Sequence, residues 1–209
     1  MSELLVDTIK TSDGSGGLTV PSTAGTLVTS SNISSYSGNL LEVLSFVPQG
    51  QTISSKQGNI TAENVTAAQV LTDTRTDITG SSIAYTPPSG AVRVEYNFNF
   101  HMARDADTAA LGEYTFLIDG TEVTKKKTSV GSNPGYGCEV EVKWVIECAH
   151  SSNDTDLGWF TSWTSAKTLK CQGRRLSAAQ EVQLHETFYW DGATGQHLTL
   201  PVLTIKAYS

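Results

Sequence analysis

The amino-acid sequence predicts an all-β protein, an antiparallel β-sandwich of the jelly-roll kind. The main evidence is one long stretch of strict alternation, in which apolar side chains occupy every second position from Val92 to Met102. Successive side chains of a strand point to opposite faces, so this stretch is a strand with one dry and one wet face. Such a strand belongs to an antiparallel sheet whose dry face needs a second layer.

Two further observations indicate that the second layer is another sheet. Asp119-Gly120 separates two strand-like runs, and this dipeptide is a strong hairpin signal because both turn residues need positive φ. About eight strand-like runs follow one another with turn signals between them and without a β-α-β rhythm. We therefore expect the sandwich to occupy residues 51–209.

Residues 1–38 have a different character. Short apolar pieces alternate with Ser- and Gly-rich runs, and such a segment cannot bury enough apolar surface to offset the entropy of ordering it. Two interpretations stay open: a disordered tail, or an extended arm that adds strands to a partner or to identical chains. The regular return of β-branched residues favours the arm. Its expected attachment residues are Leu5, Val6, Ile9, Leu18, Val20 and Leu27.

Residues 39–50 have the spacing of a short helix or linker. Asn39 and Glu42 resemble a capping box, and Pro48 ends the pattern. A helix this short is marginal alone, so its stripe must pack on the sandwich or on copies of itself around a threefold axis. The expected contacts of a homotrimer are Leu40, Leu44 and Val47.

Composition and charge exclude several partners. The net charge of -7 argues against nucleic acid, because phosphate binding needs a basic face. No apolar run approaches the length that spans a membrane, and the start of the chain lacks the pattern of a signal peptide. The chain has 3 cysteines, and this small, odd number does not fit a disulfide framework. We expect a soluble protein made in the cytoplasm.

No familiar catalytic, cofactor or metal motif is present in the sequence. We therefore expect no cofactor and no metal: Asp105 and Asp107 begin like a calcium loop, but the later ligand positions are apolar. His101 and His185 fall on the polar parity of their strands, which predicts solvated surface. The candidate contacts for a host glycan are Trp159 and Trp163, which flank a Ser/Thr-rich bend, although tryptophan is more often simply core.

Several stretches resemble a known group of proteins. The opening residues 1–9 (MSELLVDTI), the stretches 64–69 (NVTAAQ) and 76–90 (TDITGSSIAYTPPSG), and the later Tyr189-Trp190-Asp191-Gly192 are similar to short fibre-like virion proteins of marine bacteriophages, including cyanophages. The resemblance implies a tail fibre or other virion protein with an N-terminal attachment arm and a C-terminal β domain. Such fibres are typically homotrimers, and the family supplies no catalytic residues.

Three functions follow as alternatives. The first is a trimeric virion fibre whose arm docks on the particle and whose sandwich faces outward and binds the host surface. The second is a capsid decoration or head-fibre protein without a receptor role. The third is an enzyme that cleaves glycans, which we rank last because no paired carboxylates of that chemistry are evident. We expect a protein of the virion that is not an enzyme.

Overall fold

The structure, a computed structural model, describes residues 38–103, 109–133, 137–188 and 196–209. These residues form an all-β fold, and none of them lies in a helix. The fold class expected from the sequence is therefore confirmed. The strands in chain order are β1 (Leu40–Phe46), β2 (Thr52–Ser55), β3 (Gly58–Thr61), β4 (Gln69–Val70), β5 (Thr76–Asp77), β6 (Ile83–Tyr85), β7 (Arg93–Ala103), β8 (Ala110–Ile118), β9 (Thr121–Ser132), β10 (Cys138–Glu147), β11 (Lys167–Arg175), β12 (Gln183–Leu184), β13 (Glu186–Phe188), β14 (Gln196–Leu198) and β15 (Val202–Tyr208).

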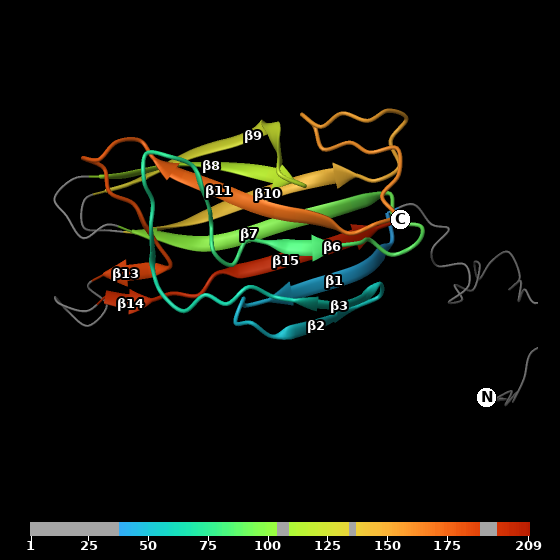
Figure 1. The fold of residues 1–209 in the computed structure, drawn as a ribbon, viewed down its shortest axis with the longest axis horizontal. Coiled ribbons are helices and arrows are strands. Elements are labelled where there is room, and N and C mark those ends of the chain that lie inside the picture. The colour runs from blue at the N-terminus through green and yellow to red at the C-terminus, as the bar shows by residue number, and fades with distance from the viewer. Residues whose placement is uncertain (1–37, 104–108, 134–136, 189–195) are drawn as a thin grey trace, which may run out of the picture.

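The strands pair as a long hairpin that has been rolled up (Figure 1). The first strand pairs with the last (β1 with β15), then β5 and β6 with β11, β7 with β10, and β8 with β9, always antiparallel. Two further pairings, β15 with β7 and β11 with β8, join these pairs into two sheets. Sheet 1 runs β1-β15-β7-β10, with β12 and β4 continuing it beside the end of β7, and sheet 2 runs from β5 and β6 through β11 and β8 to β9. This nesting is the topology of a jelly roll.

The alternation of β7 places it at the centre of sheet 1. Val94, Tyr96, Phe98, Phe100 and Met102 are all buried, while the polar residues between them face outward. Only Val92, just before the strand, is partly exposed. The buried side chains meet those of sheet 2, and the resulting core combines large aromatic rings with aliphatic side chains, each of which gains stability from the apolar area it removes from water.

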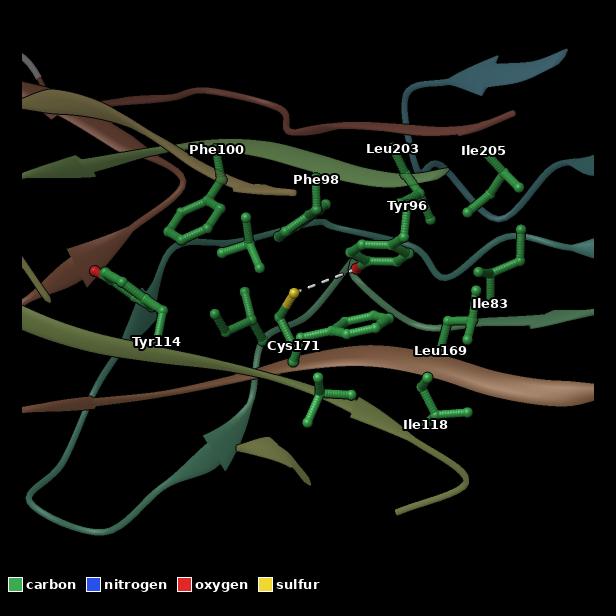
Figure 2. Packing of buried hydrophobic residues seen from close by; sticks show 14 of the residues in the cluster. Ile83, Tyr96, Phe98, Phe100, Tyr114, Ile118, Leu169, Cys171, Leu203 and Ile205 are labelled. Atoms are coloured by element: carbon green, nitrogen blue, oxygen red, sulfur yellow. Dashed lines mark hydrogen bonds between the residues drawn. The ribbon is translucent and has the colours of Figure 1, made fainter. Parts of the chain in front are cut away.

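A small polar network crosses this core, and Figure 2 shows its contact between Tyr96 and Cys171. The Tyr96 hydroxyl of sheet 1 donates to the Ser81 carbonyl at 2.7 Å and lies 3.3 Å from the Cys171 sulfur of sheet 2. The Ser81 hydroxyl in turn accepts from the Cys171 amide at 3.0 Å. All three residues are fully buried, so the network fixes how the two sheets align, because a shift would leave buried polar groups without partners.

The prediction of a short helix over residues 39–50 is wrong. Residues 40–46 form β1, an edge strand of sheet 1, and Leu44 lies opposite Ile205 of β15. The sequence pattern favoured a helix because, in a strand, Glu42 would point to the same inward side as Leu44. A buried carboxylate is not expected from the sequence. It is accommodated because it accepts hydrogen bonds from the Tyr85 hydroxyl at 2.8 Å and the Lys56 amide at 2.6 Å.

Because residues 40–46 form a strand, the apolar stripe predicted as the trimer contact does not exist. Leu44 is only 6% exposed and belongs to the core of its own chain, Leu40 is 54% exposed, and Val47 is partly buried after the strand ends. The three side chains therefore do not form one outward stripe. The sandwich begins at β1 rather than at residue 51, and residues 39–50 are part of it.

The sandwich has two distinct ends. At one end, which we call the arm end, the Gly38 amide donates to the Ser209 carbonyl and the Val92 amide donates to the Tyr208 carbonyl at 2.8 Å. The strand β7 runs from there to the opposite end, where β12 and the hairpin β13–β14 lie (Figure 1). We call this opposite end the pocket end, for the reason given below.

Candidate functional site

A pocket of about 420 Å³ lies at the pocket end, between the outer face of sheet 1 and the hairpin β13–β14. This volume falls in the range of pockets that bind small ligands. Its lining combines two imidazoles, one carboxylate and two hydroxyls. The lining residues are His101, Glu139, Thr187, His197 and Thr199.

Two cross-strand pairs from separate sheets build this pocket. His101 of β7 lies opposite Glu139 of β10, and Thr187 of β13 lies opposite His197 of β14. Directly opposed residues of an antiparallel pair place their side chains side by side on one face. The pocket therefore brings residues of β7 and β10 together with residues of the hairpin β13–β14, which is far from them in the sequence.

Hydrogen bonds fix the hairpin β13–β14 against β7. The His101 Nδ1–H donates to the Glu186 carbonyl at 2.6 Å, because a carbonyl can only accept. The His185 amide donates to the His101 carbonyl at 2.9 Å, and the Thr199 amide donates to the His185 carbonyl at 2.9 Å. The pocket walls are thus held by two backbone hydrogen bonds and one from the His101 ring, which gives the lining side chains a defined geometry.

His185 is buried between the end of β12 and the start of the hairpin β13–β14. Its side chain is inaccessible to solvent, its φ of 62° is in the left-handed region, and its Nε2–H donates to the Thr79 carbonyl at 3.0 Å. Burial lowers the pKa of His185 to about 4, against the partial compensation of the Thr79 carbonyl. The ring is therefore neutral at physiological pH. The expectation that His185 is solvated is wrong, because the left-handed residue interrupts the alternation between β12 and β13.

Gly137 allows the His101 ring to lie where it does. A Cβ at residue 137 would approach the His101 ring to 2.0 Å at Cε1 and 2.4 Å at Nε2, which no side chain could accept without moving the ring. His101 is only partly exposed, between this glycine and the Glu186 carbonyl. The expectation that His101 lies on the solvated surface is therefore met only in part.

The polar groups that line the pocket are imidazole, carboxylate and hydroxyl groups set in a largely apolar surface. Since His101 donates through Nδ1, its Nε2 can accept a hydrogen bond only in the form of the ring that carries no proton there. Glu139 contributes an exposed carboxylate, and the buried Thr199 hydroxyl has no hydrogen-bond partner among the described residues. Such a lining suits a ligand that carries several donor groups and no negative charge.

The tryptophans expected to contact a glycan lie at the arm end, away from this pocket. Trp163 is 6% exposed and packs edge-on against Tyr85 with a centroid distance of 6.2 Å, so its expected role as a surface contact is wrong. Trp159 is partly exposed and stacks on His150 with a centroid distance of 4.0 Å. The Ser/Thr-rich bend thus brings one of the pair into the core and leaves the other on the surface.

The oxygen-rich loop after β10 uses its side chains for its own structure. The Asn153 Oδ1 accepts from the Thr161 amide at 2.8 Å, and the Asp154 Oδ1 accepts from the Leu157 amide at 3.2 Å. Within the described ranges, no group of three or more His, Cys, Asp or Glu side chains could hold a metal ion. Asp105 and Asp107 lie outside the described residues.

The expected attachment residues also lie outside the described part of the chain, since the description begins at Gly38. These residues are Leu5, Val6, Ile9, Leu18, Val20 and Leu27. Among the residues that the structure does describe, no helix has the length and apolar character to cross a membrane.

No pattern along the sequence indicates this pocket. His101, Glu139, Thr187 and His197 belong to no common motif, and only strand register brings them together. No protein-family model and no curated protein sequence shows significant similarity to this chain.

Proposed function

We propose that the chain is a structural protein of a bacteriophage particle, most simply a tail fibre that binds the host surface. In this proposal the N-terminal arm, residues 1–38, anchors the protein in the virion. The jelly roll projects outward and presents its pocket end to the host. No chemical reaction is assigned to it.

The observation that best supports the proposal is that the arm end and the pocket end lie at opposite ends of the sandwich. The chain enters the sandwich at Gly38, whose amide donates to the carbonyl of Ser209, and the pocket lies at the far end of the long strand β7. A domain held at its arm end would therefore expose the pocket end to whatever it meets. The same geometry places Trp159 and Trp163 close to the anchor, where host contact is less favoured.

The fold and the resemblance add independent support. Jelly rolls recur in viral capsid and lectin domains, although a fold alone does not specify a function. The resemblance of residues 1–9 and 76–90 to phage fibre-like proteins points to the same class. The narrower role of capsid decoration fits the same fold and differs in where the protein sits on the particle.

We include a homotrimer in the proposal, in keeping with the closed symmetry usual for such fibres. Its contact cannot be the stripe of Leu40, Leu44 and Val47, since Leu44 is buried in its own chain. Leu40 and Val43 of the edge strand β1 are 54% and 46% exposed, and they offer an apolar surface close to the arm end.

Gold-labelled antibodies raised against residues 39–209 would test the proposal on purified phage particles. Labelling at the tail, together with blocked adsorption to host cells, is the expected result. Labelling of the head without an effect on adsorption would support the role of capsid decoration instead of host binding. Particles that carry no label and no peptide of this chain by mass spectrometry would overturn the proposal.

A further inference from the structure

We propose that the pocket at the end of β7 binds an uncharged sugar residue of a surface polysaccharide. This inference rests on the proposed host-binding function and deepens it by naming the ligand class and the site. It assigns binding to His101, Glu139, Thr187, His197 and Thr199 rather than to the two tryptophans.

Size is the first argument. The pocket volume of about 420 Å³ exceeds that of one sugar ring and is too small for a folded partner. Because the pocket opens between the outer face of sheet 1 and the hairpin β13–β14, a chain could enter with one residue seated and its neighbours outside.

The second argument is hydrogen-bonding chemistry. A sugar ring presents several hydroxyl groups, each of which both donates and accepts. The pocket offers the Glu139 carboxylate and, in the neutral ring, the His101 Nε2 as acceptors, and the Thr187 and Thr199 hydroxyls as groups of either kind. Of these two hydroxyls, that of Thr199 is buried below the pocket surface, so the Thr187 hydroxyl is the more accessible contact.

The third argument is charge, which decides between sugar classes. Glu139 is the one carboxylate among the described residues that line the pocket, and no Lys or Arg side chain is among them. The nearby ion pairs of Lys143 and Lys206 are formed with Glu95, farther along sheet 1. A uronic or sialic acid would bring its carboxylate toward Glu139 without a Lys or Arg in the lining to compensate, whereas a neutral sugar meets no such repulsion.

Saturation-transfer NMR on the full chain tests the inference with defined probes. We would compare D-glucose, D-galactose, D-mannose and L-rhamnose with D-glucuronate and N-acetylneuraminate. The expected result is saturation transfer to at least one neutral sugar and to neither acid. Absence of binding by all four neutral sugars, or equal binding of an acidic one, would overturn the inference.

Two variants and a matched control locate the binding. Glu139→Ala and Thr187→Val should each weaken binding of the responding sugar by about tenfold, the value of one hydrogen bond to a charged or well-placed group. Glu141→Ala, two residues along the same face of β10, should leave the affinity unchanged, since Glu141 binds the Asn97 side chain instead. Retained affinity in both pocket variants would contradict the site.

The two proposals can fail separately. A chain that is found on the particle but binds no neutral sugar would refute this inference and leave the virion role intact. A chain that binds a neutral sugar through Glu139 but is absent from particles would refute the virion role and leave the site intact.

Discussion

At the scale of single residues, His185 links the stability of the fold to the shape of the pocket. Its backbone is in the left-handed region, which is uncommon for residues other than Gly, Asn, Asp and His, and its ring is fully buried against Phe100. It also connects β7 to the hairpin β13–β14 through its own backbone. The neutral ring is therefore part of the frame that holds the pocket.

The burial of His185 predicts an acid-sensitive domain. Its folded-state pKa of about 4 lies below the ordinary 6.5, so the unfolded chain takes up a proton first as the pH falls, and stability drops between these two values. We expect a loss of about 2 kcal/mol between pH 7 and pH 5. Urea unfolding at both pH values would measure it.

A matched variant isolates this effect. Asparagine tolerates a positive φ and does not titrate, so His185→Asn should be less stable at pH 7 but should lose the pH dependence above pH 5. The hydrogen-bonded carboxylates Glu113 and Asp77 do not interfere, because their ordinary pKa values are 4.5 and 3.8 and their contributions are lost only at lower pH. An unchanged pH slope in His185→Asn would contradict the account.

At the scale of elements, β1 shows what the sequence could not reveal. The spacing of Leu40, Leu44 and Val47 fits a helix, and the alternative strand parity would bury Glu42. Only the tertiary partners Tyr85 and Lys56 make that burial acceptable, and they lie far away in the sequence. By contrast, the alternation in β7 needed no such partner, so the sequence alone predicted which of its faces is buried.

The pocket was unpredictable for a related reason. Each of its side chains has an ordinary local context, and His101 and His185 follow the polar parity of exposed strand residues. What places them is the left-handed turn at His185, which folds the hairpin β13–β14 back onto the outer face of β7. Local patterns carry the period of a strand but not the register that joins distant strands.

Alanine substitutions on opposite faces of β1 distinguish strand from helix. Leu44 is 6% exposed and Val43 is 46% exposed, as expected of neighbours in a strand at the sheet edge. Leu44→Ala should lower the free energy of unfolding by about 2–4 kcal/mol, and Val43→Ala by about 0.5 kcal/mol or less. Chemical denaturation of both variants would measure this, and equal losses would contradict the placement of β1.

At the scale of the whole molecule, the proposed fibre requires self-association. We expect the full chain to sediment as a trimer in analytical ultracentrifugation. Val43→Glu should shift the equilibrium toward the monomer, because it places a charge on the exposed apolar side of β1 without disturbing the core. A protein that is monomeric both in solution and in the particle would rule out the trimer.

The roles assigned to the two ends also predict that folding and attachment are separable. The described sandwich closes on itself from β1 to β15, so the part of the chain after residue 38 should fold without the arm. Replacing Leu5 and Ile9 by Asp should leave the sandwich equally stable while weakening incorporation into particles, because charges would be buried at the docking site. Thermal unfolding and the amount of protein per particle provide the two readings.

The most direct test of the anchored-arm account is incorporation of a chain that lacks residues 1–38. Particles assembled with only this truncated protein would be purified and quantified by mass spectrometry against particles with the full chain. We predict a soluble β domain that is lost from the virion. Normal incorporation of the truncated chain would contradict the account, because the sandwich itself would then have to carry the docking surface.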